Sequence, residues 1–287
     1  IRAYLNTLKP VHNPVAVNTL PFPFNIRGAM LVWNMLYFKK GRLQADHAKS
    51  AEWNRGAYLV EGPGHCGACH TPKTMIGGDI ADQKLQGYRL QGWFAPNITD
   101  DPARGLGKWS IADIVSYLKS GHNALTAAAG IMAEEISLSS SKMTGADLKA
   151  IAVYLKDQPG SSEAPAPLAS SSPAMKAGAA IYQDVCSACH APDGKGVPNL
   201  FPSLAASSNV RSADPTSLIR VVLEGARSVA TPSEPTGPGM PAFGRQLNDS
   251  EIAAVLTFVR NAWGSGAAAV SEKAVRDQRK KMAAKNY

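Results

Sequence analysis

The chain has 287 residues, of which 45% are hydrophobic and 18% are charged. These values exclude a disordered chain and a membrane-embedded one, and the length is sufficient for two domains with cores of their own. The net charge is +8, and the stretch 271–287 holds six Lys and Arg against two acidic residues. Because no basic stripe alternates with aromatic residues, we expect no binding to nucleic acid.

The first 45 residues contain an apolar run from Ala29 to Phe38, interrupted by Asn34 and followed by Lys39, Lys40 and Arg42. The run is far shorter than the roughly 20 residues that span a bilayer. It fits a helix lying on a membrane surface or against a partner protein, and equally a helix packed between domains.

All four cysteines lie in two copies of the pattern C-x-x-C-H, formed by Cys66, Cys69 and His70 and by Cys186, Cys189 and His190. A thiol-exchange pair does not require the histidine, and a four-cysteine zinc site does not explain it either. In covalent haem attachment the two thiols form thioethers to the porphyrin and the histidine ligates the iron. The repeated pattern therefore predicts two c-type haems.

The second axial ligand of each iron decides its chemistry, because methionine raises the reduction potential and favours electron transfer. In the second motif's region, Met240 lies in a loop between Gly239 and Pro241, a poor position for core packing. We predict that it ligates the iron opposite His190. The alternative is a loop methionine that fills a gap.

Three residues compete for the same role opposite His70. Met132 follows a glycine in an apolar, loop-like stretch and is the preferred candidate, whereas Met143 and His122 stay as alternatives. Met143 directly precedes Thr144, a predicted N-cap with Asp147 three residues later, so Met143 fits a residue packed at the start of that helix. Met75 lies too near His70 in the sequence to reach the opposite face of a haem.

The regions around the two motifs share one order of helices, which indicates an internal duplication with a period near 120 residues. Each has a helix before the motif (50–62 and 174–185), a middle helix (111–121 and 215–226) and a closing helix (145–157 and 249–263). Pro202, twelve residues after His190, is a candidate to accept a hydrogen bond from the ring of that histidine.

The stretch 157–176 is rich in Pro, Ala and Ser and predicts a linker. The residues from Ile1 resemble the closing helix at Ile151, and no signal peptide is evident, so we expect Ile1 to lie in the closing helix of a further, absent haem unit. The expected organisation is a segment at 1–45, a haem domain at 46–160, a linker at 161–173, a haem domain at 174–266 and a basic extension at 267–287.

Several stretches are shared with a known family: "LPFPFNIRGAMLVWN", "EWNRGAYLVEGPGHCGACHTPK", "GWFAPNIT", "GIMAEEI", "SACHAPDGKGVPNLFPSL" and "GPGMPAFG". The chain resembles the multihaem cytochrome c subunits of bacterial membrane-bound dehydrogenases that oxidise alcohols, sugars or aldehydes. In that family the methionine of the "MAE" stretch ligates a haem, which supports Met132. Ile131 stands where proline is common in the family.

The resemblance implies an all-α fold of two tandem class I-type cytochrome c domains. It also implies an electron-transfer subunit of the respiratory chain that is not itself an enzyme. Electrons would pass from a quinoprotein, flavoprotein or molybdoprotein subunit, with or without a small third subunit, to ubiquinone or another acceptor. The expected location is the periplasm, peripherally at the inner membrane. The alternatives are a dihaem cytochrome c peroxidase and a free dihaem electron shuttle.

Overall fold

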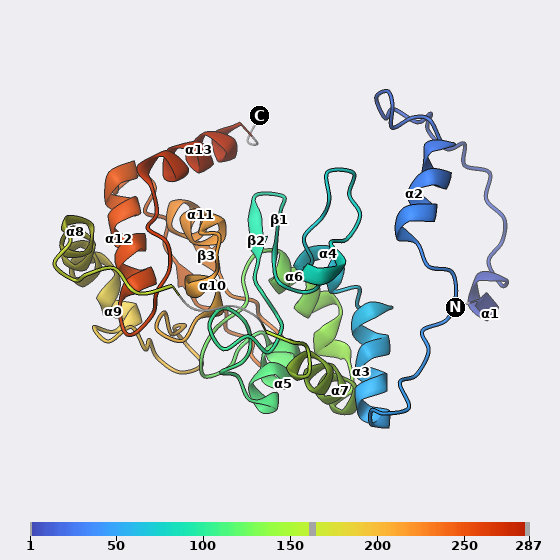
Figure 1. The fold of residues 1–287 in the computed structure, drawn as a ribbon, viewed down its shortest axis with the longest axis horizontal. Helices are drawn as coiled ribbons and strands as arrows, with labels where there is room; N and C mark the ends of the chain where they lie inside the picture. The colour runs from blue at the N-terminus through green and yellow to red at the C-terminus, as the bar shows by residue number, and fades with distance from the viewer. Residues whose placement is uncertain (1, 161–164, 285–287) are drawn as a thin grey trace. The chain divides into compact units, whose positions relative to one another are not determined.

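The computed structural model describes residues 2–160 and 165–284, which form two compact units, one ending at Arg42 and the other beginning at Leu43. Within the second unit we call residues 43–160 the first half and residues 165–284 the second half. Ile1, expected in a closing helix, lies outside the described residues. The helices and strands are α1 Arg2–Leu5, α2 Ala29–Tyr37, α3 Ala51–Glu61, α4 Gly67–His70, β1 Tyr88–Leu90, β2 Trp93–Ala95, α5 Ile111–Ser120, α6 Ile131–Leu138, α7 Gly145–Lys156, α8 Pro173–Ile181, α9 Ser187–His190, α10 Ser208–Arg211, α11 Thr216–Glu224, β3 Ala226–Arg227, β4 Gly239–Met240, α12 Asp249–Asn261 and α13 Glu272–Ala283. Figure 1 labels all of these except β4.

The three helices predicted for the first half are present as α3, α5 and α7. Each begins at a residue whose side chain accepts a hydrogen bond from the backbone three positions later: Ser50, Ser110 and Thr144. Such caps satisfy backbone N–H groups that the first helical turn leaves unpaired. The cap predicted at Thr144, with Asp147 as the donor, is confirmed.

The second half contains the corresponding helices α8, α11 and α12. Between α8 and the motif helix α9 the chain forms one stretch of π-helix from Tyr182 to Cys186. Asn248 and Glu251 form a reciprocal capping box at the start of α12. The predicted closing helix is thereby confirmed, although it ends at Asn261 rather than Trp263.

The two halves repeat one helix crossing in detail. A Cβ added at Gly56 of α3 would lie 2.0 Å from the carbonyl oxygen of Ala150 and 2.8 Å from Cβ of Tyr154 on α7. A Cβ at Gly178 of α8 would lie 2.2 Å from the Ala254 oxygen and 2.6 Å from Cβ of Phe258 on α12. In both crossings, glycine faces a carbonyl and an aromatic residue four positions later, which supports the predicted duplication.

Replacing Gly178 with alanine is expected to destabilise the protein by about 1–3 kcal/mol, because the added methyl overlaps the backbone of α12 and forces the helices apart. The control is Gly145→Ala at the first position of α7, where an added Cβ meets nothing within 4 Å. Thermal unfolding followed by circular dichroism should separate the two variants. Equal midpoints would contradict the close crossing.

The all-α prediction missed two short β-hairpins. β1 pairs with β2 in antiparallel register, with Tyr88 opposite Ala95, and β3 pairs with β4, with Ala226 opposite Met240. Gln91 and Gly92, at the tip of the first hairpin, both have positive φ, as a two-residue hairpin turn requires. The described part of the chain is therefore mostly helical with a small strand content.

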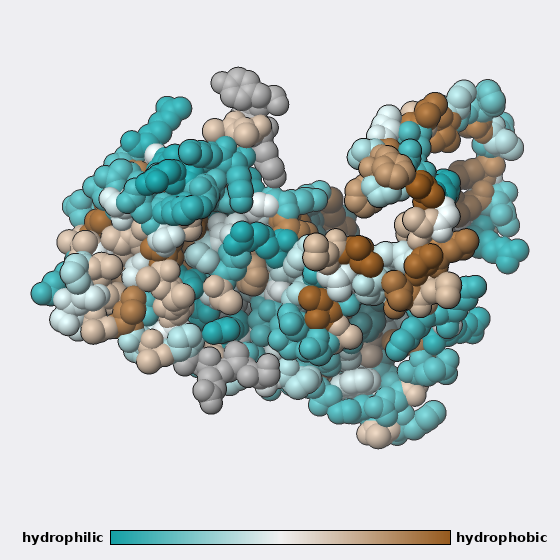
Figure 2. All heavy atoms as spheres, turned by 45° about the horizontal axis from the view of Figure 1, so that its top comes forward, coloured by the Kyte–Doolittle hydropathy of each residue, from teal (hydrophilic) through white to brown (hydrophobic). Residues whose placement is uncertain are grey.

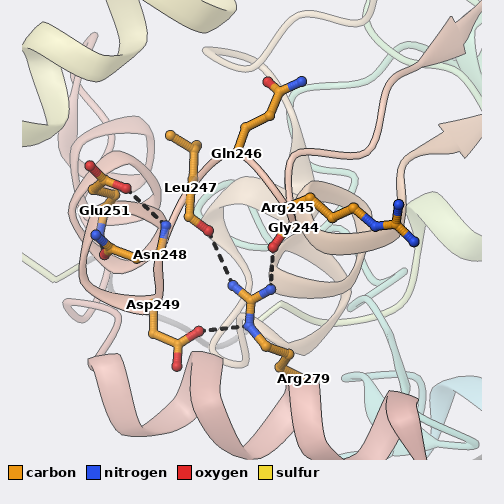
Figure 3. A pocket seen from close by; sticks show the side chains of 8 residues that line it. All are labelled: Gly244, Arg245, Gln246, Leu247, Asn248, Asp249, Glu251 and Arg279. Carbon is orange, nitrogen blue, oxygen red and sulfur yellow. Dashed lines mark hydrogen bonds and ion pairs between the residues drawn. The ribbon is translucent and has the colours of Figure 1, made fainter.

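The stretch predicted as a basic C-terminal extension contains α13, which packs on α11 and α12. Val275 is fully buried with Ile219 and Ile252. Figure 3 shows Arg279 beside a surface pocket, where its Nε donates to Asp249 at 2.8 Å and its remaining nitrogens donate to the Gly244 and Leu247 carbonyls. The hydrogen bonds of Arg279 at this pocket therefore hold α13 against the start of α12 and the loop before it.

The predicted linker includes residues 161–164, which lie outside the described residues. Its later part is attached to the second half, since the Leu168 N–H donates to Oδ1 of Asn261 at 3.0 Å. A Cβ at Gly266 would lie 1.9 Å from the Pro165 carbonyl oxygen, so the chain passes directly over this glycine.

The N-terminal unit exposes most of its apolar side chains. α2 has no buried residue, and its Trp33 and Tyr37 are only half-buried, with ring centroids 5.3 Å apart. Figure 2 shows this apolar surface in brown, at the right of the view. Among the described residues no helix is both long and apolar enough to cross a bilayer.

Candidate functional site

Both C-x-x-C-H motifs fold as a short helical turn that follows the first long helix of its half. α4 carries Cys69 and His70, and Cys66 is its N-cap; α9 is arranged in the same way around Cys186. The helical turn places the two sulfurs of a motif and the following histidine on neighbouring positions. Such a turn suits attachment of both thiols to one porphyrin edge.

Each motif histidine is oriented by a proline carbonyl. Nδ1 of His190 donates to the Pro202 oxygen at 3.1 Å, as predicted, and Nδ1 of His70 donates to the Pro96 oxygen at 2.7 Å. A carbonyl can only accept, so Nδ1 carries the proton and Nε2 presents its lone pair. This is the tautomer that an iron ligand needs.

The electrostatics of both histidines favour the neutral ring. Burial lowers the pKa of His70 and of His190, and the hydrogen bond to the proline carbonyl opposes this only in part. A neutral imidazole is the form that binds a metal. Both side chains are therefore held ready to ligate without first losing a proton.

The thiols do not resemble those of a redox-active pair. Burial, assisted by the nearby Glu135 carboxylate, raises the pKa of Cys66 to about 12, and burial raises the pKa of Cys186 to about 11. Thiol exchange requires the opposite shift, toward the thiolate. Among the described residues no three or more His, Cys, Asp or Glu side chains gather as a metal site.

A buried indole N–H in the first half lacks a partner. Trp109 is 6% exposed, and its Nε1 has no acceptor among the described residues. Trp109 belongs to the core cluster against which Cys66 packs. Because a buried donor without an acceptor is costly, an acidic group such as a haem propionate fits here. The residues present thus fit a c-type haem.

The three candidates for the second ligand of the first half lie in different surroundings. Met143 packs against the core cluster of α3, α5 and α7, as expected for a residue at a helix start. Met132 is half-buried and packs against a different cluster, formed by Ala128, Ile136 and Val229. It occupies the first turn of α6 rather than the loop that the sequence predicted.

His122 is 3% exposed and has a geometry that the sequence did not reveal. Its Nδ1 donates to the Ser120 carbonyl at 3.2 Å, and its Nε2 is buried without a partner among the described residues. It thus has a lone pair available, and it remains an alternative to Met132.

Met240 lies on β4, where backbone pairing with Ala226 fixes its position. Its carbonyl oxygen would lie 2.6 Å from a Cβ at Gly225, the residue that ends α11 with a φ of +75°. Glycine at 225 therefore permits this segment to lie close to the end of α11. The Met240 side chain is half-buried.

Sequence reasoning missed Pro96 and Trp109. Pro96 follows His70 by 26 residues, whereas Pro202 follows His190 by only 12. The distance from histidine to proline in the second half therefore did not predict Pro96 in the first half. The signal was present in "GWFAPNIT", where Pro96 directly follows β2. No pattern in the sequence indicated that the Trp109 indole lacks a partner.

Comparison with known proteins agrees with the motifs. Residues 175–263 match the cytochrome c family model. The fructose dehydrogenase cytochrome subunit of Gluconobacter japonicus is 36% identical, over 96% of this chain and 63% of the relative. The gluconate 2-dehydrogenase cytochrome c subunit of Pantoea cypripedii is 34% identical, over 96% and 67%.

A third relative, the cytochrome c subunit of the quinone alcohol dehydrogenase of Gluconacetobacter polyoxogenes, is 35% identical, over 92% of this chain and 60% of the relative. The chain thus spans between 60% and 67% of the length of these three relatives. The similarity covers both motifs and nearly the whole chain. The chain belongs to the family of dehydrogenase cytochrome c subunits.

Proposed function

We propose that this chain is an electron-transfer subunit built from two tandem cytochrome c domains, at 46–160 and 174–266. Each domain holds one haem c, through Cys66 and Cys69 or through Cys186 and Cys189. The observation that carries the proposal is the pair of C-x-x-C-H turns whose histidines each donate to a proline carbonyl. The repeated glycine crossing of α3 with α7 and of α8 with α12 supports the duplication.

In this proposal His70 and Met132 ligate the first iron, and His190 and Met240 ligate the second. When bound, such haems accept and release single electrons. The chain's own residues hold the groups that set the potential: the Pro96 and Pro202 carbonyls keep each imidazole in one tautomer, and burial keeps water away from it. The chain does not bind or transform the dehydrogenase's substrate.

The partners follow from the relatives' names, which describe subunits of fructose, gluconate and alcohol dehydrogenases. A catalytic subunit with a quinone, flavin or molybdenum cofactor, with or without a small third subunit, would supply the electrons. Ubiquinone or another respiratory acceptor would receive them. Haem attachment of this kind and such partners fit a periplasmic protein associated with the inner membrane.

The experiment is to purify the tagged protein from its own cells with any bound subunits and to add alcohols, sugars and aldehydes without oxygen. We expect one substrate class to reduce both haems. A preparation without a second subunit would favour the free shuttle, and consumption of added peroxide would favour the peroxidase. If no substrate reduced the haems of an intact complex, the proposal would fail.

The exposed apolar surface of the N-terminal unit leads to a prediction about partners. Phe22 and Phe24 are 78% and 73% exposed, and Met35 is 85% exposed. Such surfaces usually mark an interface. We expect hydrogen exchange at residues 20–40 to slow when the catalytic subunit or lipid vesicles are present. Full protection in the isolated chain would contradict this.

A further inference from the structure

The loop between β3 and β4 leaves the second half and docks on the first. Its base is closed by a hydrogen bond from the Ser228 N–H to the Pro238 oxygen at 3.0 Å. Beyond that base, the Val229 N–H donates to the Ala128 oxygen at 2.9 Å, and Oγ1 of Thr231 donates to the Ser120 oxygen at 3.2 Å. The segment that precedes Met240 is therefore fixed to the first half at two points.

The side chain of Val229 is inserted into the first half. It is 7% exposed and forms a cluster with Ala128 and Ile136, and Met132 packs against that cluster. A Cβ at Gly121 would lie only 1.9 Å from Cγ1 of Val229, so the valine fills the space that glycine leaves open. Met132 thus packs against a cluster to which the other half of the unit contributes Val229.

The start of α6 is also held by Trp93 of β2. A Cβ at Gly130, the N-cap of α6, would lie 2.7 Å from the Trp93 ring. The Arg220 guanidinium of α11 lies 4.5 Å from the centroid of the same ring. Ser217 of α11 exchanges two hydrogen bonds with the Phe94 backbone, at 2.8 and 3.0 Å. The second half therefore contacts the segment that carries Met132 in two ways: directly through Val229, and through α11, which holds Trp93.

These contacts place Met132 at the interface between the halves and Met240 on the strand that follows the docked loop. Met240 follows the docked loop directly, and Met132 packs against the cluster to which that loop contributes Val229. In Figure 1 the histidine helices α4 and α9 lie apart, on opposite sides of the region where β2, α6, α11 and β3 meet. The segment that carries Met132 and the loop that precedes Met240 both take part in the contact between the halves.

We propose that Val229 is a positioning residue for Met132, so that the second half fixes the axial ligand of the first haem. The proposal rests on the proposed function, which assigns Met132 to that iron. Methionine has three rotatable side-chain bonds and adapts readily to gaps. Its sulfur therefore depends on its neighbours for a fixed place, and truncating Val229 removes part of that support.

The test is Val229→Ala in the haem-loaded full chain, titrated with imidazole, which competes with methionine for ferric iron. We expect one of the two haems to bind imidazole at concentrations lower by on the order of tenfold, the size of effect that a buried cavity permits. The other haem should titrate as in the parent protein. The far-red absorption band of methionine-ligated ferric haem should weaken in parallel.

The matched control is Val270→Ala, which removes the same two methyl groups from a residue of 6% exposure in the cluster of α11, α12 and α13. If Val229→Ala and Val270→Ala gave the same imidazole titration, the positioning role would be wrong.

Met132→Ala separates this proposal from the one on which it rests. If Met132→Ala leaves the far-red band intact, the ligand assignment fails and the proposed function must be revised. If Met132→Ala halves the band while Val229→Ala changes nothing, only the positioning role fails.

Discussion

Replacing Cys186 and Cys189 with serine is expected to unfold the second half while the first half stays folded. Without the covalent haem, the described residues of this half retain two small clusters, and Cys186 itself packs against one of them. We expect a loss comparable with the whole stability of a small domain, ~5–15 kcal/mol. Limited proteolysis should then cut within residues 175–264.

The first half should survive because its main cluster is formed entirely by residues between Ala57 and Leu155, with no contribution from the second half. The mirrored variant, Cys66→Ser with Cys69→Ser, is the control and should reverse the pattern. If the second half of the Cys186 and Cys189 variant resisted protease as well as the parent protein does, the haem would not be part of its core.

Replacing Met240 with alanine is expected to remove half of the far-red methionine band and to lower one of the two reduction potentials. A methionine ligand raises the potential, and axial ligands span ~0.8 V across haem proteins, so a fall of roughly 0.1 V or more is expected. The fold should persist, since β4 is held through backbone pairing with Ala226. Spectroelectrochemical titration measures both quantities.

The control for Met240→Ala is Met143→Ala, which deletes the same side chain from a residue that packs against the first core cluster. It should lower stability slightly and leave the band and both potentials unchanged. If Met143→Ala removed half of the far-red band, Met143 rather than Met132 would be the ligand of the first iron. A spectrum unaltered by Met240→Ala would show that the second assignment is wrong.

Local sequence patterns predicted the elements that local chemistry determines. The helices α3, α5, α7, α11 and α12 follow from apolar spacing, and their starts follow mainly from capping side chains such as Ser110 and Thr144. The carbonyl of Pro202 was predictable because it lies in a short loop after His190. Each of these features depends on residues close together in the chain.

Features that depend on distant segments were missed. Strands β1 and β2 have three residues each, too few for a pattern of alternation to stand out. The many charges of α13 concealed Val275, which is buried only because α11 and α12 lie beneath it. The contact of Val229 with the cluster at Met132 joins residues about a hundred positions apart, and no spacing rule describes it.

Intact mass spectrometry of the purified protein, followed by peptide mapping, tests the central claim of two covalently attached haems most directly. We expect the mass of the polypeptide plus two haems, with one haem on the peptide that contains Cys66 and Cys69 and the other on the peptide that contains Cys186 and Cys189. The claim would be contradicted if protein produced in cells that contain the haem-attachment machinery still showed free thiols, a disulfide or bound zinc at either motif.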